Sequence, residues 1–145
     1  MPVMTGKKAR LAVAAGPEAA ERYNSFIRTL GFIHSSEAHK LIVAGDEIID
    51  HLLNHGDTGR NGLHVLVHRQ RHSLPLAFFI DSHRQFAAFS HGVPSGVIPE
   101  PYYDADSRRW RGMGLVMCSN LARQVVYRPG LVSDRIWLTF PSETP

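Results

Sequence analysis

The spacing of apolar side chains predicts a strand and then a helix near the start of the chain. Residues 8–15 alternate loosely between apolar and polar side chains, as a strand with one buried face does. From Pro17 to about Leu30, apolar residues recur at every third or fourth position, which indicates an amphipathic helix. Pro17 suits the first turn of that helix, and Gly31 suits its end.

A second, longer helix is expected to run to about His55 and to stop at Gly56, with Ser35 or Ser36 as its N-cap. Two rows of side chains follow this helix. The apolar row comprises Leu41, Ala44, Ile48, Ile49, Leu52 and Leu53, and the polar row beside it comprises Glu47, His51, Asn54 and His55. Such a helix packs one face against a neighbour and presents a polar flank beside it.

Two pairs of strands are predicted in the rest of the chain. Residues 63–68 alternate, residues 74–81 are largely apolar, and the short connector between them indicates a hairpin. Residues 124–128 and 134–140 are expected to form the second pair, joined by a turn through Pro129-Gly130.

The segment between these two pairs differs from the rest. Residues 82–110 contain three prolines and two glycines, show no periodicity and predict a mobile loop or lid. An apolar helix is expected after it, from about Gly114 to Arg123. Taken in order, the elements predict one α/β (α+β) sandwich domain over residues 1–145, in which three helices cover one face of a mixed, mostly antiparallel sheet.

Composition limits the classes of function. The chain has 145 residues, 43% hydrophobic and 20% charged, which is typical of one soluble globular domain. Cys118 is the single cysteine, which excludes a disulfide framework and a multi-cysteine zinc site. A net charge of +3 is too small to argue for nucleic-acid binding. Because we recognise neither a membrane span nor a secretory signal, we expect a cytoplasmic protein.

Three groups of residues could carry chemistry. On the second helix, Glu47 and His51 lie one turn apart and could share a ligand, a proton or a metal, although a solvated helix face has the same pattern. Asp81 follows an apolar strand and could bind a ligand amine or cap a turn. Gly112 and Gly114, beside Arg111, could bring backbone N–H groups to an anion at a helix N-terminus, or only allow a tight entry to the helix.

In this order and on these elements, the three groups resemble the motifs of the gyrase, histidine kinase and mismatch-repair ATPase superfamily. The most similar branch is that of bacterial anti-sigma factors that are also serine-protein kinases, which carry E-x-x-x-N-x-x-x-H-G, D-x-G-x-G and R-G-x-G-L. The corresponding residues here are Glu47-x-x-x-His51-x-x-x-His55-Gly56, Asp81-Ser-His83-Arg-Gln85 and Arg111-Gly-Met-Gly114-Leu115. The resemblance covers about residues 10–140 and implies the histidine kinase-like ATPase fold, with residues 82–110 as its ATP lid.

The resemblance also implies roles for individual residues. Glu47 lies where the family has the carboxylate that polarises the attacking hydroxyl or water, and His51 where it has the asparagine that holds Mg²⁺. Asp81 corresponds to the acid that binds the adenine amino group. The implied nucleotide site comprises His51, Asn54, His55, Asp81, His83, Gln85, Arg111, Gly112 and Gly114, with ATP and Mg²⁺ as cofactors and with His51 and Asn54 next to the metal.

Some of these residues depart from the family pattern. Imidazole at His51 is a poor ligand for Mg²⁺, which prefers oxygen, and Asn54 would reach the site at a different angle. His83 and Gln85 replace glycines that should lie against the base. We therefore expect weak or absent ATP binding, little changed by Mg²⁺, on an otherwise intact fold.

The leading hypothesis is a regulatory protein of the partner-switching type, which binds a sigma factor or an anti-sigma-factor antagonist and possesses a degenerate ATP site. The family often forms homodimers. An active ATP-dependent serine-protein kinase is the alternative, and a metal-binding module using Glu47, His51 and His55 is a third hypothesis. The basic runs 68–72 and 107–111 have no aromatic-interleaved sheet in the sequence pattern, so no nucleic-acid partner is expected.

Overall fold

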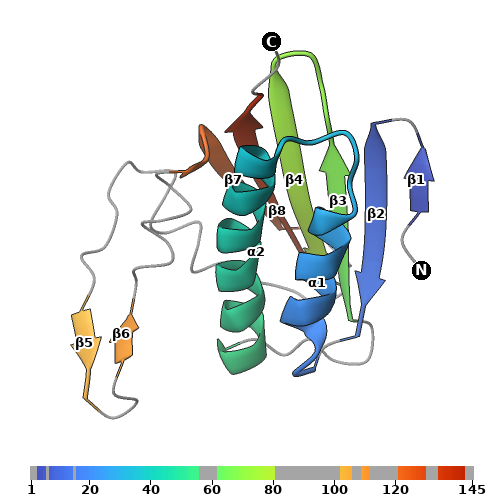
Figure 1. Cartoon of the computed structure of the whole chain (residues 1–145). Coiled ribbons are helices and arrows are strands. Elements are labelled where there is room, and N and C mark those ends of the chain that lie inside the picture. The colour runs from blue at the N-terminus through green and yellow to red at the C-terminus, as the bar shows by residue number, and fades with distance from the viewer. Residues whose placement is uncertain are drawn as a thin grey trace.

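The computed structural model describes residues 3–5, 7–14, 16–55, 62–80, 102–105, 109–111, 121–129 and 134–142. In chain order its elements are β1 (Val3–Thr5), β2 (Lys8–Val13), α1 (Ala19–Arg28), α2 (Ser35–His55), β3 (Leu63–His68), β4 (Ser73–Ile80), β5 (Tyr102–Asp104), β6 (Arg109–Arg111), β7 (Gln124–Pro129) and β8 (Asp134–Pro141). Six strands form one sheet in the order β1-β2-β3-β4-β8-β7, and β5 and β6 pair separately (Figure 1).

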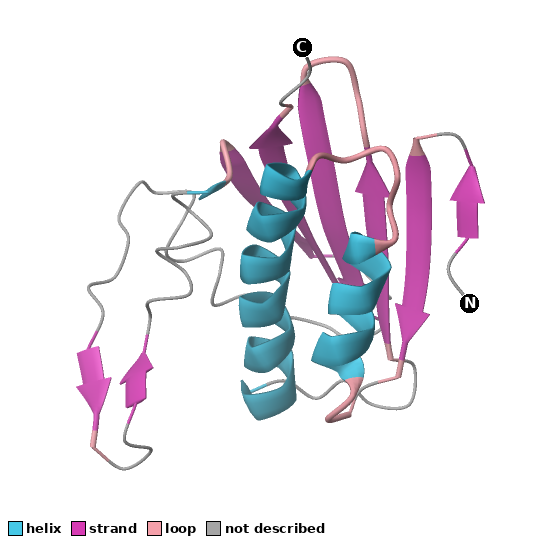
Figure 2. Ribbon diagram, viewed as in Figure 1, coloured by secondary structure: helices cyan, strands magenta, loops and turns pink. Residues whose placement is uncertain are grey.

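The architecture is an α+β sandwich, as the sequence predicts. Both α1 and α2 cover the same face of the six-stranded sheet (Figure 2). The predicted strands and helices are confirmed at β2, α1, α2, β3, β4, β7 and β8, and the two predicted strand pairs are formed. Every pairing among the described strands of this sheet is antiparallel, so its described part is not mixed.

Three details differ from the sequence prediction or fall outside the structure. Strand β1 was not predicted, and the short hairpin β5–β6 lies in the segment 82–110, where regular structure was not expected, and ends one residue beyond it at Arg111. Of the predicted third helix, residues 112–120 lie outside the described residues; Leu121 is helical, and Ala122 and Arg123 are not. In the described part of the chain, two helices therefore cover the sheet, α1 and α2.

The core lies between α1, α2 and the sheet because alternate strand residues point toward the helices. On the strands, the buried apolar side chains include Leu11, Val13, Val65, Val67, Leu74, Leu76, Phe78, Ile80, Ile136, Leu138 and Phe140. On the helices they include Tyr23, Phe26, Ile27, Leu41, Ala44, Ile48 and Ile49. The apolar row predicted on the second helix thus faces the sheet wherever its side chains are described.

The helices approach most closely where Tyr23 of α1 meets α2. Tyr23 is fully buried, and its hydroxyl donates a hydrogen bond to the carbonyl of Leu41 at 2.5 Å. A Cβ atom added at Gly45 would lie 2.2 Å from the Tyr23 ring. Glycine is required at this position because the ring occupies the space of any side chain.

We expect Gly45→Ala to destabilise the protein although alanine is the better helix former. Overlap with a ring that is held on all sides costs about 1–3 kcal/mol in similar cases, more than the gain of about 1 kcal/mol in helix propensity. Urea unfolding measures the difference. Gly31→Ala is the matched control because a Cβ there meets nothing within 4 Å, and an equal effect of both substitutions would contradict the packing argument.

One end of the sandwich is held together by Arg69, the residue after β3. Its Nε donates to the carbonyl of Phe32 at 2.5 Å, and one terminal nitrogen donates to Oγ of Ser142 at 2.6 Å. The other terminal nitrogen forms an ion pair with Glu37, which also accepts the backbone N–H of His34 at 2.8 Å. We call these five residues the Arg69 cluster.

The Arg69 cluster also explains how α2 begins. The helix starts at Ser35, and the Glu37 carboxylate reaches back to the N–H of the residue before it. That is the reciprocal half of a capping box. This contact differs from the side-chain cap predicted at Ser35 or Ser36.

We expect Arg69→Met to destabilise the protein strongly. The ion pair is almost completely buried, with side-chain exposures of 5% for Arg69 and 1% for Glu37, so the substitution leaves a buried carboxylate without its cation. Such losses cost about 3–5 kcal/mol. Arg71→Met, at an exposed neighbour, should change the free energy of unfolding by less than about 0.5 kcal/mol. The double substitution Arg69→Met with Glu37→Leu should recover part of the loss.

Candidate functional site

The course of α2 decides where the predicted site residues lie. Its first turn is attached to the Arg69 cluster, at the end of the sheet where β3 ends and β8 ends. A helix of 21 residues is about 31 Å long and therefore carries His55 to the opposite end. There β4 ends at Ile80, opposite the first residue of β8, Asp134. The end of α2 and the end of β4 therefore lie at the same end of the sandwich (Figure 1), and in the sequence the predicted Asp81 follows Ile80 directly.

Glu47 lies on the flank of α2 that faces away from α1. The opposite flank contacts α1, because Gly45 lies under Tyr23 and Asp46 is hydrogen-bonded to Asn24. Each helical residue turns by about 100°, which carries Glu47 past Asp46 and out of that contact. The Glu47 side chain is half-buried. The same geometry continues the flank through the backbone positions 51, 54 and 55.

Asp46 takes part in helix packing. Burial raises the pKa of its carboxyl group, and the hydrogen bond with Asn24 partly opposes that rise by lowering the pKa. Both side chains are half-buried between the helices. The two adjacent acids, Asp46 and Glu47, therefore have different surroundings, and only Asp46 lies in the contact between the helices.

We expect Asp46→Asn to stabilise the protein at pH 7 more than at acidic pH. Because the pKa is raised in the folded state, the folded protein binds more protons than the unfolded chain just above pH 3.8, and the free energy of unfolding falls as pH rises through that window. Asparagine has no carboxyl group to titrate, so the variant should not lose this part of the free energy of unfolding as pH rises. Urea unfolding across pH 3 to 7 gives the comparison, and a gap between variant and wild type that does not change with pH would contradict it. Asn24→Ala should extend the wild-type decline to higher pH, because it removes the hydrogen bond that lowers the pKa.

The structure describes only part of the predicted nucleotide site. Side chains of His51, Asn54 and His55 lie outside the described residues, although their backbone forms the end of α2. Asp81, His83, Gln85, Gly112 and Gly114 also lie outside them. Arg111 is the last residue of β6, paired with Tyr102, and does not belong to the six-stranded sheet. Among the described side chains, no group of three could hold a metal ion.

One residue at this end was missed by the sequence analysis. Asp134 is completely buried at the start of β8, next to the end of β4. The signal was available in the alternation of the strand, since Asp134 is in phase with Ile136, Leu138 and Phe140, which point into the core. Asp134 is therefore a buried acid at the end of the sandwich where β4 ends.

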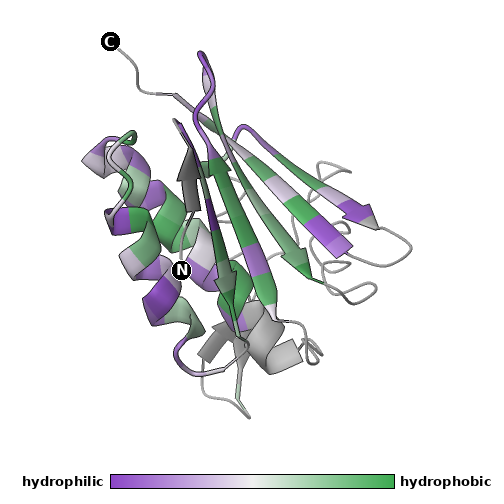
Figure 3. Ribbon diagram, turned by 90° about the vertical axis from the view of Figure 1, so that its right-hand side faces the viewer, coloured by the Kyte–Doolittle hydropathy of each residue, from purple (hydrophilic) through white to green (hydrophobic). Residues whose placement is uncertain are grey.

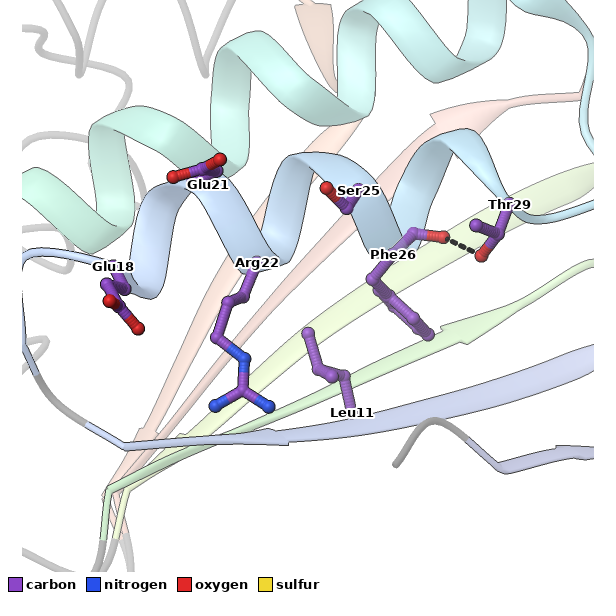
Figure 4. A pocket seen from close by; sticks show the side chains of 7 residues that line it. All are labelled: Leu11, Glu18, Glu21, Arg22, Ser25, Phe26 and Thr29. Atoms are coloured by element: carbon purple, nitrogen blue, oxygen red, sulfur yellow. Dashed lines mark hydrogen bonds between the residues drawn. The ribbon is translucent and has the colours of Figure 1, made fainter.

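A cavity of about 480 Å³ lies elsewhere, between α1 and β2. Figure 4 shows Arg22 reaching from α1 toward β2 beside Leu11, while Glu21 points to the other side of the helix. None of the predicted site residues lines this cavity. Its location on the α1 side separates it from the flank of α2 that carries Glu47.

Comparisons with known proteins give no family for the chain. It matches no model of a known protein family and no curated protein. Within the described residues, no helix has the length and apolar character needed to cross a membrane.

Proposed function

We propose that this chain is a regulatory protein of the partner-switching type, built on a histidine kinase-like ATPase fold with a degenerate nucleotide site. It acts by binding a sigma factor or an anti-sigma-factor antagonist. The observation that carries the proposal is the course of α2. Its polar flank, with Glu47, turns away from α1 and leads to the end of the sheet where β4 runs into Asp81.

The order of the described elements supports the same proposal. The elements follow one another as the resemblance requires: a strand comes first, then two helices, then two pairs of strands. The two pairs join within one sheet, where β4 lies beside β8. Motifs from the middle and the C-terminal part of the chain can therefore reach one end of the sandwich.

The residues at that end do not fit a magnesium ion well. Mg²⁺ requires oxygen ligands in near-octahedral geometry, and the position one turn after Glu47 holds an imidazole. Phosphoryl transfer depends on the metal to neutralise charge on the phosphates, so the loss of a ligand reduces the rate strongly. We therefore favour a binding function over the active serine-protein kinase, which remains the alternative because Glu47 occupies the position of the catalytic carboxylate.

We expect weak ATP binding to the wild-type protein, with little effect of Mg²⁺. His51→Asn places an amide oxygen on the flank of Glu47 and should make binding depend on Mg²⁺, with affinity gained by about tenfold, equivalent to 1.4 kcal/mol. Glycines at positions 83 and 85 should add to the gain. Calorimetry with ATP and a non-hydrolysable analogue, with and without Mg²⁺, measures these changes.

His39→Asn provides the control, because it makes the same substitution on an exposed position near the start of α2, distant from Glu47. Tight binding of Mg-ATP by the wild type, together with phosphate transfer to an antagonist protein, would establish the kinase alternative. If ATP binding to the His51→Asn variant still did not depend on Mg²⁺, that result would argue against the nucleotide site itself.

A further inference from the structure

The sheet has a second face, turned away from α1 and α2, which we call the outer face. Figure 3 shows the helices on one side of the sheet and this face on the other. Its side chains come from the strand positions that alternate with the core. Across β2, β3, β4, β8 and β7, one row in register is Arg10, Leu66, Ala77, Trp137 and Val126, and the next row is Ala12, His64, Phe79, Arg135 and Arg128.

The centre of the outer face is apolar. Leu66, Phe79, Trp137 and Val126 are all half-buried, which leaves part of each side chain accessible. The rings of Phe79 and Trp137 pack edge to face, with centroids 5.6 Å apart. A continuous apolar strip therefore crosses the four strands from β3 to β7.

The charges on this face are all of one sign. Its cationic side chains are Lys8, Arg10, Arg128 and Arg135, and no Asp or Glu occupies an outward position on the described strands β2, β3, β4, β7 and β8. The helical layer carries more acids than cations: its acids are Glu18, Glu21, Glu37, Asp46, Glu47 and Asp50, and its cations are Arg22, Arg28 and Lys40. The described part of the molecule therefore has an acidic helical layer and a basic outer face.

Two of these cations lie directly opposite each other. Arg128 on β7 is paired in register with Arg135 on β8, and both are exposed. Like charges in this position destabilise a sheet. A hollow of about 340 Å³ lies over the two strands and is lined by the two arginines, by Trp137 and Val126, and by the polar residues Gln124 and Thr139. The hollow combines two apolar side chains, Trp137 and Val126, with a pair of arginines that repel each other, so it is suited to a ligand that supplies negative charge and apolar surface together.

We propose that the outer face is a docking surface for an amphipathic helix of a protein partner, with its apolar stripe on Leu66, Trp137 and Val126 and its acidic side chains toward Arg128, Arg135 and Arg10. This inference rests on the proposed function, since it names the surface through which the regulatory protein holds its partner. Apolar grooves with a charged rim recognise such helices in many complexes. The five strands from β2 to β7 span about 19 Å, which a helix of about 14 residues crosses.

Two other occupants are less well matched. A second copy of this chain, placed face to face, would bring four cations against the same four cations. A single-stranded nucleic acid needs open ring faces on which bases stack, whereas here Phe79 and Trp137 pack against each other in an otherwise aliphatic strip. The charge and the apolar strip together favour the acidic helix.

The test titrates the ¹⁵N-labelled full chain with a synthetic helical peptide of about 14 residues, whose leucine stripe is flanked by glutamates on both sides. We expect amide shift changes confined to β2, β3, β4, β7 and β8. Arg135→Glu should weaken peptide binding by about tenfold or more. The thermal unfolding midpoint of this variant should not fall below that of the wild type, because the new glutamate faces Arg128 with the opposite charge. Arg22→Glu is the control, because Arg22 is exposed and belongs to α1, on the opposite side of the sheet from the outer face, and this variant should bind as the wild type does.

Several results would overturn the proposal. These are shifts on α1 or α2 instead of the sheet, equal binding of a scrambled peptide of the same composition, or no shifts at millimolar peptide. Tighter binding of a 20-nucleotide thymidine oligonucleotide in the parallel titration would identify a nucleic acid, instead of a protein helix, as the partner of the outer face. The nucleotide calorimetry is a separate measurement, since Arg135→Glu should leave ATP binding unchanged and His51→Asn should leave peptide binding unchanged.

Discussion

The buried guanidinium of Arg69 is the interaction on which the rest of the structure depends. It contacts the α1–α2 connection at Phe32, the first turn of α2 at Glu37 and the segment after β8 at Ser142. Its backbone N–H also donates to the carbonyl of Lys7, just before β2, at 2.9 Å. Because these segments meet at one end of the sheet, the direction of α2 is fixed from there. The last turn of α2, which carries part of the predicted nucleotide motif, consequently lies at the other end, remote from the cluster that stabilises the fold.

Much of this fold follows from periodicity, and the exceptions have physical causes. Helix α2 and the paired strands are long enough for their apolar spacing to identify them. Strand β1 and the β5–β6 hairpin each have only three residues per strand, too few for a pattern. Arg69 lies in a basic run that resembles a solvated turn, and its burial results from three partners that are distant in sequence. Such long-range pairing leaves no local signal.

The candidate site was predictable to a smaller extent. The sequence predicts the polar flank of α2 because helical spacing alone aligns Glu47 with positions 51, 54 and 55. The direction in which that flank faces depends on two contacts between elements: the packing of Tyr23 against Gly45, and the ion pair of Arg69 with Glu37. No local sequence pattern shows such contacts. The basic outer face was also missed, since its four cations belong to three strands, β2, β7 and β8, and share one face only through the order and register of the sheet.

The two proposed binding surfaces, the end of α2 and the outer face of the sheet, differ in their effect on the stability of the fold. At the end of α2, the proposed loss of magnesium binding depends on one position, His51, where the sequence has an imidazole instead of an oxygen ligand, and it requires no change elsewhere in the fold. The outer face retains a feature that costs stability, because Arg128 and Arg135 repel each other across the strands. Replacing either arginine would relieve that repulsion without disturbing the core behind it. In the proposed complex, acidic side chains of the partner would lie against both arginines, so binding would remove a repulsion that the free protein retains.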